Sequence, residues 1–139
     1  DHLWDTNFFT WAWSNRNDYD LIIGSKRCDP TLNKQDSYRK LLSDGLNTIL
    51  QFLFDSAVAD THGMKLLKAV TVKPLANQCV MSRGQFDTEL TLRALRTKFW
   101  IAEVPVPYIE KRKARNLMIR KITQNIFDIY SHRNLNMQI

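Results

Sequence analysis

A short apolar run near the start of the chain is the feature that most limits the fold. Residues 21–23 read Leu-Ile-Ile and stand between an Asn- and Asp-rich stretch at 15–18 and Gly24. A β-branched run bounded by turn residues is typical of a buried strand. Before it, residues 6–15 place their apolar side chains at helical spacing, namely Phe8, Trp11 and Ala12. A helix followed by a buried strand is half of an α/β repeat, so we predict an α/β fold.

The strongest helix signal begins near Ser37, after a polar loop at 25–35. Its apolar positions recur every three or four residues and define one face. These positions are Leu41, Leu42, Gly45, Leu46, Ile49, Leu50 and Leu53. Phe52 and Phe54 widen the stripe beyond what a surface helix needs. We favour a core helix and keep an interfacial membrane helix as the alternative.

The second half of the chain continues the alternation of helices and strands. The expected elements are, in order, a strand at 64–67, a weak helix at 72–79 broken near Pro74, a helix at 87–98 with Leu90, Ala94 and Leu95 facing inward, a strand at 100–104 and a helix at 117–131. Pro105 and Pro107 make the continuation of the last strand an edge or a bend. We expect one domain spanning residues 1–139.

The bulk composition agrees with a single globular domain. The chain has 139 residues, of which 44% are hydrophobic, and compact domains most often have roughly 100–150 residues. No apolar run approaches the ~20 residues that span a bilayer, and the start carries no signal-peptide pattern. We therefore expect a cytoplasmic protein, either free or in peripheral contact with the membrane surface.

The chain is basic, with a net charge of +6 and a sequence pI of about 9.5. Such a charge attracts nucleic acid, phosphorylated small molecules or an acidic membrane surface, and it does not choose among them. Cys28 and Cys79 are far apart in the sequence, which favours free thiols over a disulfide. His2, His62 and His132 are scattered, so the spacing predicts no zinc site.

Two clusters have the character of phosphate sites. Residues 24–27, Gly-Ser-Lys-Arg, directly follow the first strand, and ligands of open α/β sheets bind beyond the carboxyl ends of strands. Residues 37–40, Ser-Tyr-Arg-Lys, put Arg39 in the first turn of the long helix, where positive charge opposes the macrodipole. An anion bound beside Arg39 and the helix N-terminus would explain that charge. For both clusters, a solvated surface is an equal alternative.

Two acidic clusters, at 60–63 and 86–89, contain carboxylates that could hold a metal, act as a general base or cap a helix. Asp87 has a structural role available as the N-cap of its helix, and Glu89 is favourable in the first turn. Asp60 has no helix to cap. Asp60 is therefore the better candidate for direct chemistry.

A basic run, Lys-Arg-Lys-Ala-Arg at 111–115, follows the last strand and its two prolines. Runs of this kind are solvated faces or nucleic-acid patches in many proteins. The preceding strand would place this one on a defined loop above the sheet, so a pyrophosphate site competes with those interpretations.

Read in order, five motifs resemble those of a family 2 glycosyltransferase of the GT-A fold, and within it the dolichol- or polyprenyl-phosphate sugar synthases. They are DLIIGSKR at 20–27, YRKLLS at 38–43, DTHGMK at 60–65, FDTEL at 86–90 and EVPV at 103–106. The third is one residue shorter than the family pattern. The family's basic loop corresponds to Lys111 and Arg112, with Ala114 and Asn116 in place of its usual Gly and Ser.

The resemblance, which covers about residues 19–121, implies transfer of a sugar from a nucleotide-sugar donor to a phosphorylated lipid or another acceptor such as a glycan. It implies a short mixed sheet flanked by helices, and a divalent metal, Mg²⁺ or Mn²⁺, that binds the donor pyrophosphate as a Lewis acid. The catalytic candidates are then Asp60, Asp87 and Glu89. The substrate-binding candidates are Arg27, Arg39, Lys111 and Arg112.

The family's N-terminal half, with its nucleotide-binding βαβ units and its D-x-D metal motif, has no counterpart in this sequence. Asp1 is the candidate for the last carboxylate of that motif. We expect an acceptor-side half that is inactive by itself and whose sheet edges favour a homo-oligomer. A non-catalytic interaction domain and a basic nucleic-acid-binding module are the alternatives. The acidic clusters would repel a phosphate backbone, so we expect no nucleic-acid partner.

Overall fold

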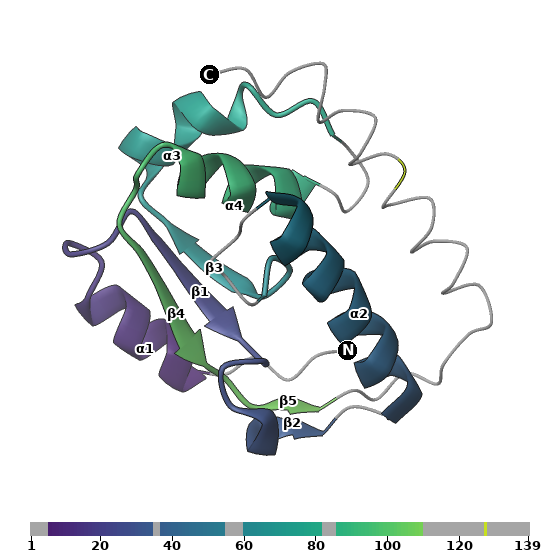
Figure 1. Ribbon diagram of the computed structural model, residues 1–139. Helices are drawn as coiled ribbons and strands as arrows, with labels where there is room; N and C mark the ends of the chain where they lie inside the picture. Colours follow the sequence, from purple (N-terminus) through teal and green to yellow (C-terminus); the bar gives the residue numbers. More distant parts are fainter. Residues whose placement is uncertain (1–5, 35–36, 55–59, 82–85, 110–126, 128–139) are drawn as a thin grey trace.

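The computed structural model describes residues 6–34, 37–54, 60–81, 86–109 and 127. Its main sheet has three strands in the order β3-β1-β4 (Figure 1). The strands are β1 (Leu21–Ser25), β3 (Met64–Leu67) and β4 (Ile101–Pro105). Because β1 runs antiparallel to β3 and parallel to β4, the sheet is mixed. The predicted α/β class and the short mixed sheet are confirmed.

The central strand β1 is buried along its whole length. Leu21 and Ile23 pack into one cluster with residues of α3 (Ala69–Ala76) and α4 (Phe86–Arg96). Ile22 packs into another cluster with residues of α1 (Thr6–Ser14). Successive side chains of a strand point to opposite faces, so helices cover both faces of the sheet.

The predicted helices at 6–15 and 87–98, and the strands at 64–67 and 100–104, are confirmed to within two residues. As expected, α4 buries Leu90 and Ala94. The helix α1 differs in one respect, because Trp11 is 40% exposed whereas Phe8 and Ala12 are buried. The Trp11 ring instead stacks on Tyr19, with ring centroids 6.4 Å apart.

A second, small sheet replaces part of the loop predicted at 25–35. A 3₁₀ turn, η1 (Pro30–Leu32), leads into β2 (Asn33–Lys34), which pairs in parallel with β5 (Tyr108–Ile109). The predicted bend after β4 is present, because the chain leaves the main sheet at Pro105 and joins β2 through β5. Strands of two residues carry no recognisable period in the sequence.

The helix α3 begins and ends three residues earlier than predicted, and Pro74 does not break it. A proline inside a helix removes one hydrogen bond, here to the carbonyl of Val70, and its ring crowds that carbonyl. Val72 and Leu75, on either side of the proline, are buried in the core. Packing therefore carries the helix through Pro74 to Ala76.

The long helix α2 (Ser37–Phe54) is present, but part of its predicted inward face points to solvent. Leu41 and Ile49 are 70% and 41% exposed, and Phe52 is 88% exposed. The core-helix interpretation is wrong for these three side chains, because they are exposed rather than packed in the core of the described residues.

The loop before β3 comes very close to β1 because Gly63 has no side chain. A Cβ on Gly63 would lie 2.1 Å from the carbonyl oxygen of Gly24 and 3.2 Å from Cγ2 of Ile23. That oxygen belongs to the central strand, so it cannot move without disturbing the pairing of Gly24 with Met64. The approach fixes residues 60–63 against the end of β1.

Replacing Gly63 by Ala should lower the free energy of unfolding by about 2–3 kcal/mol, because the added methyl group overlaps backbone atoms. Urea denaturation measures the change. Gly45→Ala is the matched control, since a Cβ on Gly45 meets nothing within 4 Å. In the helix α2 that substitution should raise stability by about 0.5–1 kcal/mol. Similar effects at both positions would contradict the close approach.

Candidate functional site

Polar side chains gather at one edge of an otherwise apolar sheet. The strands β1 and β4 are parallel, so Ser25 and Pro105 end at the same edge. The strand β3 begins there as well, because Met64 pairs with Gly24. We call the following side chains the carboxyl-edge cluster: Ser25, Asp60, Thr61, Lys65, Asp87, Thr88 and Glu103. Open α/β sheets bind their ligands beyond this kind of edge.

Asp60 is the centre of the carboxyl-edge cluster and is only 3% exposed. Its Oδ2 accepts a hydrogen bond from the backbone N–H of Lys26 at 3.4 Å, and its Oδ1 accepts one from that of His62 at 3.1 Å. Its own backbone N–H donates to Oε1 of Glu103 at 2.8 Å. Hydrogen bonds to a carboxylate offset the cost of burying it. One residue therefore joins the end of β1, the loop before β3, and β4.

Lys65 brings a positive charge beneath this loop. Its side chain is 6% exposed, and Nζ lies 3.9 Å from Oδ1 of Asp87. Nζ also donates to the backbone oxygens of Thr61 and Gly63, at 2.8 and 3.0 Å. Burial lowers the pKa of Lys65, while the negative charges of Asp87 and Asp60 act in the opposite direction. The lysine thus pairs with the cluster's carboxylates and fixes the loop backbone.

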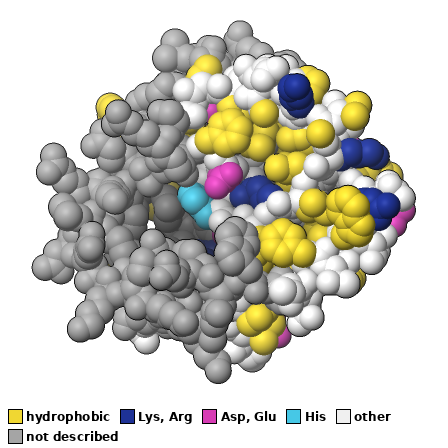
Figure 2. All heavy atoms as spheres, turned by 180° about the vertical axis from the view of Figure 1, so that it is seen from behind, with side chains coloured by type: hydrophobic (Ala, Val, Ile, Leu, Met, Phe, Trp, Pro, Cys, Tyr) yellow, Lys and Arg dark blue, Asp and Glu magenta, His cyan; other side chains and the backbone are white. Residues whose placement is uncertain are grey.

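The first turn of α4 closes the carboxyl-edge cluster. The hydroxyl of Thr88 lies 3.3 Å from that of Thr61, and both are buried. Asp87 is the second residue of α4, which begins at Phe86, so it is not the N-cap that we predicted. With 52% of its side chain exposed, Asp87 is the carboxylate of the cluster most open to a ligand. From behind, an exposed carboxylate adjoins a basic side chain and a histidine (Figure 2).

Glu89 lies in the same helix but faces the core, where it is 4% exposed. Its Oε2 accepts hydrogen bonds from the backbone N–H groups of Val80 and Met81, at 3.0 and 2.7 Å. Its Oε1 is 2.9 Å from both Nε and Nη2 of Arg93. Both carboxylate oxygens of Glu89 therefore hold the segment after α3 against α4. This geometry favours a structural role for Glu89 over the predicted catalytic one.

Of the two predicted phosphate-binding arginines, Arg27 makes a contact between the end of β1 and α2. The backbone N–H of Arg27 donates to Oγ of Ser25 at 3.2 Å, and Nη1 lies 2.5 Å from Oδ1 of Asp44 in α2. This ion pair ties the end of β1 to α2. Arg39 lies in the first turn of α2, and its side chain is outside the described part of the structure. A bound phosphate would share Arg27 with Asp44.

The two cysteines are free thiols in different surroundings. Cys28 is exposed and close to the cluster. Its pKa is raised by burial and by the charges of Glu103 and Asp60, against a hydrogen bond with Ser25 that lowers it. Cys79 packs against the core, and burial raises its pKa to about 11. Cys28 is therefore the thiol that reports on the carboxyl-edge cluster.

Sequence reasoning did not single out Ser25, Thr88 or Glu103 as site residues. For Glu103 a signal existed, because it lies within a predicted strand between Ala102 and Val104. A carboxylate on a largely buried strand needs a partner, which here is the backbone of Asp60.

Several predicted features lie outside the described residues: Asp1, Lys111, Arg112 and, apart from Phe127, the final helix at 117–131. Within the described ranges, no group of three or more His, Cys, Asp or Glu side chains could hold a metal ion. The carboxyl-edge cluster therefore does not fit a metal site of its own, and the divalent metal stays a prediction. None of the described helices combines the length and the apolar character needed to cross a membrane.

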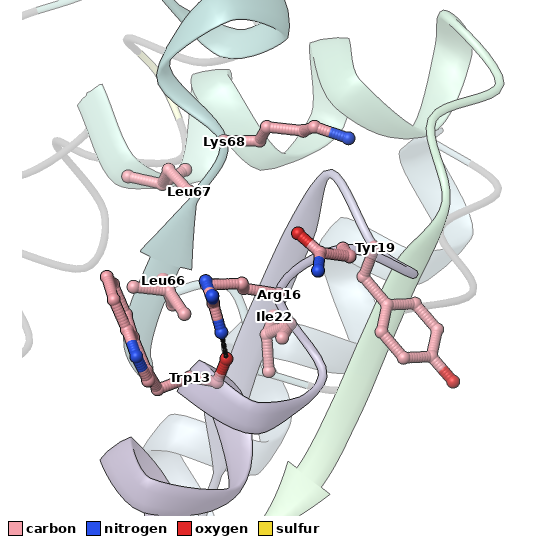
Figure 3. Close-up of a pocket in the computed structure, with 8 residues that line it drawn as sticks. Trp13, Arg16, Tyr19, Ile22, Leu66, Leu67 and Lys68 are labelled. Atoms are coloured by element: carbon pink, nitrogen blue, oxygen red, sulfur yellow. Dashed lines mark hydrogen bonds between the residues drawn. The ribbon is translucent and has the colours of Figure 1, made fainter.

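A hollow of about 200 Å³ lies at the opposite edge of the sheet, where β1 begins. Trp13, Arg16, Tyr19 and Lys68 contribute to its lining (Figure 3). The Arg16 guanidinium carbon lies 4.4 Å from the centroid of the Trp13 ring, and Nη1 donates to the carbonyl of Trp13 at 2.6 Å. Ile22 of β1 and Leu66 of β3 also line the hollow, so it extends along the face of the sheet that α1 covers.

No model of a known protein family matches this chain, and no solved structure matches it.

Replacing Glu89 by Ala should lower the free energy of unfolding by about 3–5 kcal/mol, because Arg93 would be left buried without its carboxylate. Asp87→Ala, two residues earlier, should cost less, about 1 kcal/mol, because the Asp87 side chain is 52% exposed and the buried Lys65 keeps its hydrogen bonds to the carbonyls of Thr61 and Gly63. Urea denaturation followed by circular dichroism compares the two variants. If Glu89→Ala were as stable as Asp87→Ala, the structural role of Glu89 would be wrong.

Proposed function

We propose that this chain is the acceptor-side part of a glycosyltransferase that moves a sugar from a nucleotide-sugar to a phosphorylated lipid or a glycan. The observation that supports this most is the convergence of the sequence motifs in space. Stretches that are far apart along the chain contribute side chains to a single edge of the sheet.

Four of the five motifs have a contact at that edge, and the second motif lies next to a residue that has one. The first motif supplies the Lys26 N–H to Asp60 of the third, and Glu103 of the fifth accepts the N–H of Asp60. The fourth motif reaches the third through Thr88 and Asp87. The second motif is followed directly by Asp44, which pairs with Arg27. Motifs matched by chance would have no reason to meet, so the convergence favours a shared chemical role.

In this proposal Asp87 acts on the acceptor. Its half-exposed carboxylate can remove the proton of an acceptor hydroxyl as the new bond forms between the acceptor oxygen and the anomeric carbon. The bond from that carbon to the donor's diphosphate oxygen breaks, and the nucleoside diphosphate leaves with the electron pair. A phosphate acceptor is already ionised at neutral pH and needs cations for orientation instead. Sequence reasoning favoured Asp60 as the base, whereas exposure favours Asp87.

Asp60 and Lys65 then act as positioning residues. Asp60 is saturated by backbone N–H groups and holds the loop at 60–63 against β1. Lys65 fixes the same loop through two carbonyl oxygens and lies beside Asp87. The roles of Arg27, Arg39, Lys111 and Arg112 in binding the donor phosphates remain predictions.

Donor binding at the cluster can be measured through Cys28. Alkylation of the chain with iodoacetamide, followed by mass spectrometry, should label the exposed Cys28 before Cys79, whose pKa is raised to about 11. UDP- or GDP-sugar with Mn²⁺ should slow the labelling of Cys28 about tenfold when the free donor is at about ten times its Kd. Labelling of Cys79 serves as the internal control and should not change.

A parallel titration with short duplex DNA tests the nucleic-acid alternative. Micromolar, salt-sensitive binding of DNA, with no protection of Cys28 by any nucleotide-sugar, would overturn the proposal in favour of a basic nucleic-acid-binding module. If inorganic pyrophosphate protected Cys28 as well as the nucleotide-sugars do, the site would recognise only the phosphates of the donor.

A further inference from the structure

The outer side of α2 carries an apolar stripe that the described structure leaves in solvent. Tyr38, Leu41, Ile49 and Phe52 are all exposed, and together they form what we call the α2 stripe. Tyr38 and Leu41 are three residues apart, as are Ile49 and Phe52, and about two helical turns separate the two pairs. All four side chains therefore lie on one narrow side of the helix, with Gly45 between the pairs. The stripe extends from the first turn of α2 to its last.

The opposite side of α2 is more polar. Lys40, Asp44 and Gln51 are half-buried and point away from the stripe by helical spacing. Asp44 makes the ion pair with Arg27 at the end of β1. Among its described side chains, α2 thus attaches to the protein through polar groups and presents apolar groups outward, the reverse of an ordinary surface helix. Figure 1 shows α2 along the rim of the described elements.

We infer that the α2 stripe lies in the headgroup layer of an anionic membrane. A helix of 18 residues is about 27 Å long, and its polar side suits a position in the plane of the interface rather than across the bilayer. Tyr38 at one end has the apolar ring and polar tip that favour this layer. The stripe supplies the apolar contact area.

Charge selects an anionic bilayer over a second copy of the chain. The protein carries a net charge of +6, so two copies repel each other whereas anionic headgroups attract each copy. The first turn of α2 contains Arg39 and Lys40 and no acidic residue. Positive charges there oppose the helix macrodipole, and neighbouring lipid phosphates would compensate them.

This inference does not rest on sugar transfer, because vesicle binding is measured without donor or acceptor. If the chain bound vesicles but donor did not protect Cys28, only the proposed function would be contradicted. If donor protected Cys28 but the chain did not bind vesicles, only the membrane inference would be contradicted.

Flotation with vesicles tests the α2 stripe. The whole chain should float with vesicles of phosphatidylcholine containing about one third phosphatidylglycerol, bind less to pure phosphatidylcholine, and dissociate as salt is added. Leu41→Gln and Phe52→Gln should each lower the partition coefficient about tenfold, because each removes one apolar side chain from the interface. Lys40→Gln should lower it less than either of these, because Lys40 is half-buried and points away from the α2 stripe.

Matched controls come from α3. Val70 is an exposed apolar residue and Lys73 an exposed cation, and Val70→Gln and Lys73→Gln should leave flotation unchanged. All the substituted side chains except that of Lys40 are exposed, so we expect the variants to keep the fold. Thermal unfolding of each variant checks this. Absence of flotation, or equal losses in the controls, would overturn the inference. Self-association that is removed by Leu41→Gln and Phe52→Gln, without flotation, would assign the stripe to a second copy instead.

Discussion

The burial of β1 on both of its faces is the constraint on which the rest of the structure depends. With α1 packed on one face and α3 and α4 on the other, the strand has room for apolar side chains only. Polar groups can stand only where the strand ends. At Ser25 the chain leaves the core, and the next N–H, that of Lys26, is bound by Asp60. The carboxyl-edge cluster is thus a consequence of how β1 is buried.

The elements that could be predicted are those whose signal lies within one short stretch of sequence. The β-branched run of β1 and the helical period of α4 are of this kind, and both were placed correctly. The strands β2 and β5 could not be predicted, because each has two residues and exists through pairing with the other. The break predicted near Pro74 is absent for a related reason. The packing of Val72 and Leu75 stabilises α3 by more than the proline destabilises it.

The candidate site shows where sequence reasoning stops. Asp60, Asp87 and Glu89 were all catalytic candidates, with Asp60 preferred, yet the structure gives them different surroundings that the sequence did not indicate. Asp60 accepts N–H groups from the end of β1 and from its own loop, Glu89 contacts Arg93 and the segment after α3, and Asp87 is half exposed. What distinguishes a base from a structural carboxylate is therefore its set of partners. These partners include residues distant along the chain, so composition and spacing could identify the candidates but not separate them.

The contact between Arg27 and Asp44 connects the two proposals in space. It fixes the polar side of α2 to the end of β1, so α2 lies beside the end of the sheet that carries the carboxyl-edge cluster. A protein resting on a membrane through this stripe would hold the cluster near the headgroups, where a phosphorylated lipid could reach Asp87 without leaving the bilayer.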